Sequence, residues 1–224
     1  MVGGKGTDMN MPSPELDELL AGYRRFRDHG WQTERERWTS LREGQQPRVM
    51  VIACSDSRVD PSHIFDVNPG EIFVVRNVAA LVPPFETTPG HHGVSAALEF
   101  AVQFLHVSQI VVLGHGMCGG CQAALTQSML GCEPGKGGFV ADWISLLDEV
   151  RADIVAAHGT SGHAAERAME QAGVKVSLAN LRTFPCIQLK EGRGTLKLVG
   201  AFFAITDGVL HLLDEDSGTF HPAI

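Results

Sequence analysis

Residues 111–125 of the chain read VVLGHGMCGGCQAAL. A β-branched apolar run, a glycine-rich turn and a run of small helix-forming residues follow one another, which predicts a strand, a tight turn and a helix. Two similar apolar runs precede it, RVMVIAC over 48–54 and EIFVVR over 71–76. Nearly unbroken runs of this kind are typical of parallel strands that are buried on both faces.

Helical segments alternate with these strands. Helical periodicity is found over 91–105, and two further helices are expected around 140–157 and 163–183. The end of the chain, TLKLVGAFFAI and VLHLL joined by residues 206–208, is typical of an antiparallel hairpin. This order predicts an α/β fold, in which a central, mostly parallel sheet with an antiparallel edge hairpin is flanked by helices.

An arm precedes the first strand. Residues 1–12 are polar and rich in glycine, and we expect them to be disordered. Ser13 followed by proline predicts a helix start, and residues 33–36 fit the capping box of a second helix. We therefore expect one domain over 13–224, whose N-terminal helical arm, 13–44, covers a partner subunit.

The composition excludes several classes of protein. The 224 residues carry a formal net charge of −8, which disfavours binding to nucleic acid or to an anionic membrane surface. No apolar run is long enough to cross a bilayer, and the N-terminus does not resemble a signal peptide, so we expect a cytoplasmic protein. In a reducing compartment the five cysteines are better interpreted as ligands, nucleophiles or buried residues than as disulfides.

Two chemistries fit the turn after the third predicted strand only in part. Its glycines match the dinucleotide-binding pattern G-x-G-x-x-G, but a histidine and a thiol occupy positions where the backbone must approach phosphate. Residues 116–120 also match a nucleophile elbow with cysteine in place of serine. The acid and base that this elbow needs, Asp207 and His211, lie within a single hairpin, where they cannot flank the nucleophile.

A metal site accounts for more of the sequence. Cys54 ends the first predicted strand, while His115 and Cys118 lie where the third one ends, and ligands of α/β sheets bind at such carboxyl ends. Zinc prefers thiolate and imidazole ligands, and three protein ligands with one open position are typical of catalytic zinc. Cys121 could form a zinc knuckle or a redox pair with Cys118, but packing of a small buried residue is the simpler interpretation.

Two motifs point to a known family. The segment ACSDSRVDPSHIFDVNPGEIFVVRNVAALVPP (53–84) and the segment LGHGMCGG (113–120) resemble the C-S-D-S-R and G-H-x-x-C-G-G signatures of the β-class carbonic anhydrases. The likeness extends over residues 40–213, and each motif fits independently.

The resemblance implies a mechanism as well as a fold. One zinc ion per chain would be held by Cys54, His115 and Cys118, and zinc-bound hydroxide would convert carbon dioxide reversibly to bicarbonate and a proton. Asp56 and Arg58 would form the family's dyad, in which the carboxylate orients the hydroxide. Released from the arginine, the same carboxylate could fill the fourth zinc position and stop the reaction.

Further positions match by resemblance. Gln45, Phe73, Val78 and Phe100 fall where plant-like members line the carbon dioxide pocket, with the glutamine supplied by a partner subunit. Taken alone, the three apolar residues would pass as core residues. The implied partners are carbon dioxide or bicarbonate and further copies of the chain, in a homodimer or a tetramer.

One departure separates the chain from part of the family. Val51 stands where bacterial members with closed, bicarbonate-regulated sites carry a tryptophan, and the only tyrosine, Tyr23, lies far upstream. The open-site, plant-like type is therefore expected. The alternatives are a hydrolase of carbonyl sulfide or carbon disulfide on the same fold, and an inactive metal-binding protein in which Asp56 permanently ligates zinc.

Overall fold

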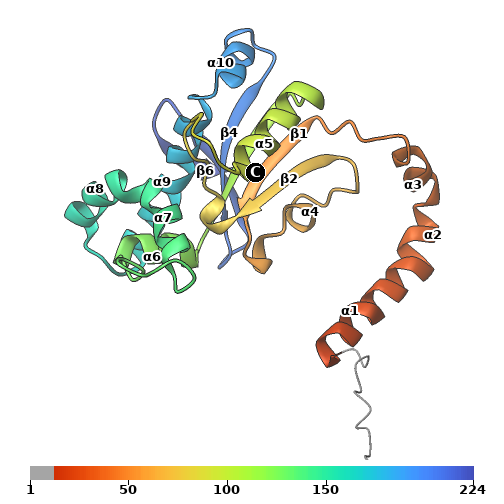
Figure 1. Cartoon of the computed structure of the whole chain (residues 1–224), viewed down its shortest axis with the longest axis horizontal. Coiled ribbons are helices and arrows are strands. Elements are labelled where there is room, and N and C mark those ends of the chain that lie inside the picture. Colours follow the sequence, from red (N-terminus) through yellow and green to blue (C-terminus); the bar gives the residue numbers. More distant parts are fainter. Residues whose placement is uncertain (1–12) are drawn as a thin grey trace, which may run out of the picture. The chain divides into compact units, whose positions relative to one another are not determined.

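The computed structural model describes residues 13–224, and the chain separates into two compact units, residues 1–45 and 46–224. The polar stretch 1–12, for which the sequence predicts disorder, lies outside the described residues. Figure 1 colours the chain from the N-terminal helices to the last strand.

The described part of the first unit is helical. It consists of α1 (Pro14–Arg25), a π-helical turn (Phe26–Gly30), α2 (Trp31–Thr33) and α3 (Arg35–Leu41). The predicted cap is confirmed, because the Leu16 backbone N–H donates to Ser13 Oγ at 3.3 Å. The predicted capping box is wrong: α3 begins after Glu34, no side chain of residues 13–45 caps it, and the Thr33 hydroxyl donates to the His29 carbonyl instead.

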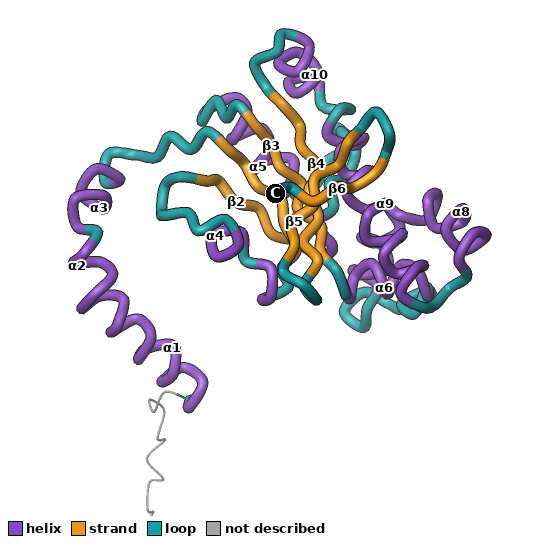
Figure 2. Tube along the Cα trace, turned by 180° about the vertical axis from the view of Figure 1, so that it is seen from behind, coloured by secondary structure: helices purple, strands orange, loops and turns teal. Residues whose placement is uncertain are grey.

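The second unit is built on one sheet. Within the described residues its six strands lie in the order β2-β1-β3-β4-β5-β6, with β1 to β4 parallel and β5 and β6 antiparallel (Figure 2). The predicted α/β architecture and its edge hairpin are thus confirmed, and β6 is a strand that the sequence reading missed. The strands are β1 (Val49–Cys54), β2 (Ile72–Asn77), β3 (Gln109–His115), β4 (Lys197–Ala204), β5 (Val209–Asp214) and β6 (Thr219–Pro222).

The prediction that all three apolar strands are buried on both faces is wrong for β2. Every residue of β2 is half-buried, whereas β1 and β3 are almost entirely buried. The reason is position: β2 forms one edge of the sheet, so only one of its sides is covered by a neighbouring strand.

Alternating side chains of the strands enter two apolar layers. Met50 and Ile52 of β1 pack on one face against Leu98 and the helices α5, α9 and α10. Val51 and Ala53 face the opposite side, towards Ile64 and Phe65 beside α4. The helices are α4 (Pro61–Ile64), α5 (Gly93–Glu99, extended by a π-helical turn Phe100–Phe104), α6 (Gly119–Thr126), α7 (Gly138–Ile144), α8 (Asp148–His158), α9 (His163–Leu181) and α10 (Pro185–Gly192).

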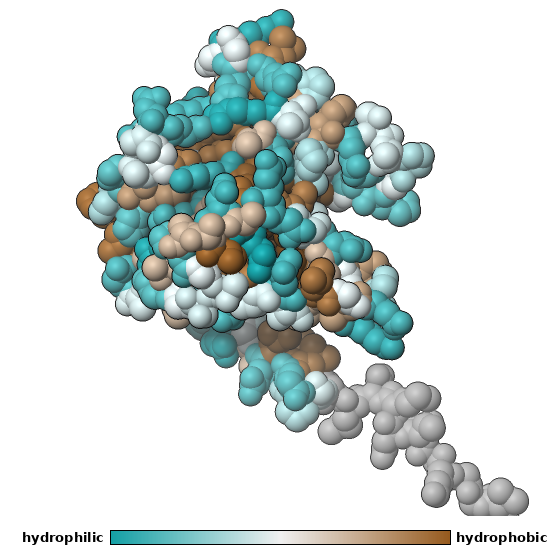
Figure 3. All heavy atoms as spheres, turned by 90° about the vertical axis from the view of Figure 1, so that its left-hand side faces the viewer, coloured by the Kyte–Doolittle hydropathy of each residue, from teal (hydrophilic) through white to brown (hydrophobic). Residues whose placement is uncertain are grey.

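Helices α6, α7 and α8 gather beside α9 at one side of the sheet (Figure 1). On the face drawn in Figure 3, hydrophobic residues are interspersed with hydrophilic ones. No helix formed by residues 13–224 combines the length and the apolar character needed to span a membrane.

A close approach of α9 to β3 gives a test of the packing. A Cβ on Gly114 would lie 2.5 Å from Val174 Cγ2, so Gly114→Ala must push α9 away from the sheet. We expect it to lower the free energy of unfolding by about 1–3 kcal/mol in urea titrations. Gly192→Ala is the matched control, because a Cβ there meets nothing within 4 Å. Equal stability of the two variants would contradict the close packing.

Candidate metal centre

Three potential ligands converge where β1 and β3 end. Cys54 is the last residue of β1, His115 is the last residue of β3, and Cys118 directly precedes α6. Because β1 and β3 are adjacent and parallel, their carboxyl ends meet at the same edge of the sheet. The two sulfur atoms and an imidazole nitrogen all lie within 4.8 Å of one another, and the three residues are at most 6% exposed.

The imidazole of His115 has one nitrogen whose lone pair is available to bind a cation. Its Nδ1 lies 2.9 Å from the Gly116 carbonyl oxygen, which can only accept, so the proton resides on Nδ1. Nε2 is then an acceptor, and it is buried without a hydrogen-bond partner among the described residues. A buried unpaired acceptor beside two thiols fits zinc, whose usual ligands are nitrogen and sulfur.

Hydrogen bonds among the sulfur atoms shift their pKa values. The hydrogen bond with Cys118, together with burial, raises the pKa of the Cys54 thiol to about 12. The pKa of Cys118 is also raised to about 12, chiefly by a hydrogen bond with Cys121 and then by burial. Cys121 is thus a buried neighbour of the cluster, and a bound cation would have to displace the thiol protons.

Asp56 and Arg58 form a two-pronged ion pair beside the cluster. Arg58 Nε donates to Asp56 Oδ1 at 2.9 Å, and Arg58 Nη2 donates to Oδ2 at 2.6 Å. These bonds hold the pKa of Asp56 well below its usual range, so the carboxylate stays ionised at neutral and alkaline pH. Arg58 Nη2 also donates to the Met117 carbonyl at 3.0 Å, which ties the first motif to the turn of the second.

Arg76 holds the loop that follows Cys54. From β2 it donates to the Cys54 carbonyl at 2.9 Å, the Asp56 carbonyl at 2.6 Å and the Asp60 carboxylate at 2.7 Å. The sequence offered a signal for this role, because Arg76 ends a mainly apolar predicted strand. A cation that is partly buried there needs several hydrogen-bond acceptors.

Glu170 is the residue near the cluster that the sequence analysis missed. Its side chain on α9 is 5% exposed, and its Oε1 accepts from the Cys118 backbone N–H at 3.1 Å. Burial raises the pKa of this carboxyl. A glutamate among the apolar positions of the predicted helix 163–183 was the available signal, since buried carboxylates are rare without a partner.

Of the four expected pocket residues, the structure brings one to the cluster. Val78 packs on the turn after Cys118, because a Cβ on Gly120 would lie 2.7 Å from Val78 Cγ1. Phe73 and Phe100 contact each other, with ring centroids 5.9 Å apart, on the sheet face covered by α5. Gln45 belongs to the N-terminal unit, where it is exposed.

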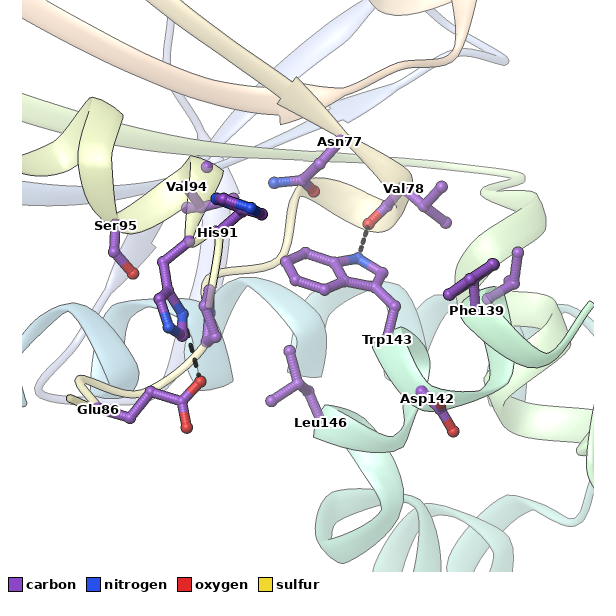
Figure 4. Close-up of a pocket in the computed structure, with 14 residues that line it drawn as sticks. Asn77, Val78, Glu86, His91, Val94, Ser95, Phe139, Asp142, Trp143 and Leu146 are labelled. Carbon is purple, nitrogen blue, oxygen red and sulfur yellow. Dashed lines mark hydrogen bonds and ion pairs between the residues drawn. The ribbon is translucent and has the colours of Figure 1, made fainter. Parts of the chain in front are cut away.

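A cavity of about 650 Å³ adjoins Val78 (Figure 4). Trp143 Nε1 donates to the Val78 carbonyl at 2.8 Å and thereby fixes the segment after β2. His91 and His92 line the same cavity, and His92 Nδ1 lies 3.5 Å from a Glu86 carboxylate oxygen. Ala79, next to Val78, has a φ of 63°, a strained conformation of the kind that clusters at functional sites.

Comparisons with known proteins agree with this geometry. A model of the carbonic anhydrase family matches residues 49–210. A carbonic anhydrase from Pseudomonas aeruginosa is 36% identical over 215 residues, covering 93% of this chain and 94% of that protein. Beta carbonic anhydrase 3 from Arabidopsis thaliana is 32% identical over 205 residues, which cover 91% of this chain and 79% of that protein.

Solved structures are also similar. The β-carbonic anhydrase CcaA superposes with a TM-score of 0.86 at 31% identity, covering 93% of this chain and 99% of that one. A Coccomyxa β-carbonic anhydrase in complex with acetazolamide gives a TM-score of 0.77 at 30% identity, with 93% of each chain covered. The chain belongs to the β-class carbonic anhydrase family, whose members are carbonate dehydratases, a group of lyases.

The Arg76 bonds give a test of how the loop is held. Arg76→Lys keeps the charge but loses the planar fork that reaches three acceptors, so we expect the free energy of unfolding to fall by about 2–4 kcal/mol. Urea denaturation would measure this, with Arg193→Lys at an exposed position as the matched control. Equal stability of the two variants would show that these bonds do not hold the loop.

Proposed function

We propose that the chain is a zinc enzyme that interconverts carbon dioxide and bicarbonate, with one zinc held by Cys54, His115 and Cys118. The observation that carries this proposal is the buried, unpaired Nε2 of His115, which lies with two thiols within 4.8 Å of one another. Membership of the carbonic anhydrase family supports the reaction, and the donor set supports the metal.

Zinc, when bound, lowers the pKa of a coordinated water to about 7 and so supplies hydroxide at neutral pH. The chain's own residues then orient the reaction. Asp56 is ionised, so it can accept a hydrogen bond but cannot donate one. An O–H group bound at the cluster would therefore point its hydrogen towards Asp56. Arg58 occupies both carboxylate oxygens and keeps Asp56 from turning towards the metal ligands.

The proposed pocket supports an assembly of several copies. Phe73 lies four residues before the end of β2, about 13 Å along the strand from the end that adjoins the cluster. Phe73 and Phe100 would therefore line the carbon dioxide pocket at the metal site of another copy and not the pocket of their own chain. The β2 edge and the stacked pair of exposed rings Phe100 and Phe104 offer an interface for that copy, and two related β-carbonic anhydrases from Sordaria macrospora are described as tetrameric.

A cytoplasmic location completes the proposal. All five cysteines of the chain are free thiols, which suits a reducing compartment. The net charge of −8 supports the expectation that neither nucleic acid nor an anionic membrane surface is a partner.

The metal assignment predicts which cysteines matter. We expect the purified protein to carry zinc and to hydrate carbon dioxide, and expect Cys54→Ala and Cys118→Ala to lose most of the metal. Their hydration rate should fall at least about 10-fold, since even groups that only support zinc ligands cost this much. Cys132→Ala and Cys186→Ala are matched controls that should retain both properties.

Atomic emission for zinc and stopped-flow hydration would measure these changes. Full zinc content in both Cys54→Ala and Cys118→Ala would refute the ligand assignment. Carbonyl sulfide hydrolysis should be assayed in parallel, because faster turnover of that substrate would favour the alternative hydrolase. The relatives reported above are named carbonic anhydrases and give that alternative no support.

The assembly is tested separately. We expect light scattering to show a homodimer or a larger homo-oligomer, which deletion of residues 1–40 weakens. Phe104→Glu should also weaken it by placing a charge on the ring pair, whereas Phe139→Glu, at a similarly exposed phenylalanine, is the control. A fully active monomer of the intact chain would contradict the proposed assembly.

A further inference from the structure

Glu170 contacts the candidate metal turn without being one of its ligands. It projects from α9, and its carboxylate accepts a hydrogen bond from the backbone N–H of Cys118. The Cys118 bond is 3.1 Å long, and the glutamate is 5% exposed. This bond to a buried carboxylate joins α9 to the turn.

The backbone of the turn explains why an acceptor is needed there. Met117 has a φ of 56°, a left-handed conformation that side-chain-bearing residues rarely adopt. Such a residue directs successive N–H groups towards one point, where they form a small anion-binding nest. Cys118 precedes α6, so its N–H has no partner within that helix. Without Glu170 the Cys118 N–H would be left without this acceptor.

Neighbouring charges fix the glutamate and the opposite side of the turn. Arg167 Nε lies 4.0 Å from Glu170 Oε2, and its guanidinium lies 4.7 Å from the centre of the Phe202 ring. From the other side, Arg58 donates to the Met117 carbonyl. The Met117–Cys118 segment is thus held at the Cys118 N–H by Glu170 and at the Met117 carbonyl by Arg58.

We propose that Glu170 is a positioning residue for the metal centre: by accepting from the Cys118 backbone N–H it keeps the Cys118 sulfur directed at the metal. The inference rests on the proposed zinc site. A purely architectural glutamate would instead join α9 to the turn without affecting how long the metal stays bound. Partners of this kind around metal ligands change metal affinity or activity by about 10- to 100-fold.

Two substitutions of Glu170 distinguish these roles. Glu170→Gln keeps a side-chain oxygen that can accept from the Cys118 N–H, whereas Glu170→Ala removes the acceptor. We expect zinc release into excess chelator to be about 10- to 100-fold faster in the alanine variant and close to wild type in the glutamine variant. Glu166→Ala, one turn earlier on α9, is the matched control and should release zinc at the wild-type rate.

A cobalt-substituted protein adds a spectroscopic readout. The thiolate-to-cobalt absorption should change in Glu170→Ala and be preserved in Glu170→Gln. Wild-type release and an unchanged spectrum in Glu170→Ala would overturn the inference, as would a glutamine variant that behaves like the alanine one. A wild-type protein that retains no zinc would overturn the proposed function as well, whereas a zinc-loaded wild type with an unaffected alanine variant would overturn this inference alone.

Discussion

The parallel pairing of β1 and β3 is the constraint on which the candidate site depends. The register pairs Ala53 with Leu113, so the residues that follow on both strands emerge at the same edge of the sheet. Cys54 and His115 are brought together by this register alone, although they are 61 positions apart in the chain. A slip of one residue would turn either side chain to the opposite face and separate the ligands.

Around this edge, a small set of charged groups holds irregular backbone in place. Arg76 secures the loop after β1, Arg58 joins that loop to the turn after β3, and Glu170 holds the same turn from α9. Arg76 is half-buried and makes three hydrogen bonds, which offset the cost of its burial. Arg58 is exposed, and Glu170 is buried with its oxygen on the Cys118 N–H. Met117, whose carbonyl accepts from Arg58, has a left-handed φ within this network. We propose that this network orients the cluster as well as stabilising the fold.

Much of the fold and of the cluster could be predicted because periodicity and strand ends are local properties. The three parallel strands, the terminal hairpin and the convergence of Cys54, His115 and Cys118 follow from runs of apolar residues and from two motifs. The exposed side of β2 could not be predicted, since being at the edge of a sheet depends on strand order.

Contacts between residues that are distant in the sequence could not be predicted from local patterns either. Glu170 lies 52 residues after Cys118, and only the packing of α9 on β3 brings them together. The capping box at 33–36 failed because Thr33 closes the preceding helical turn and Glu34 takes the capping position. Phe73 and Phe100, which the family resemblance assigns to the pocket, lie together on the sheet face covered by α5 and not at the cluster.

The central claim is that the cluster holds zinc with one position left open, while Asp56 remains paired with Arg58. A crystal structure of the zinc-loaded protein at about pH 8, above the pKa near 7 of zinc-bound water, tests it most directly. We expect zinc on Cys54, His115 and Cys118, with the Asp56 carboxylate on the Arg58 guanidinium. Asp56 bound directly to the metal, or a metal absent from these three residues, would contradict it.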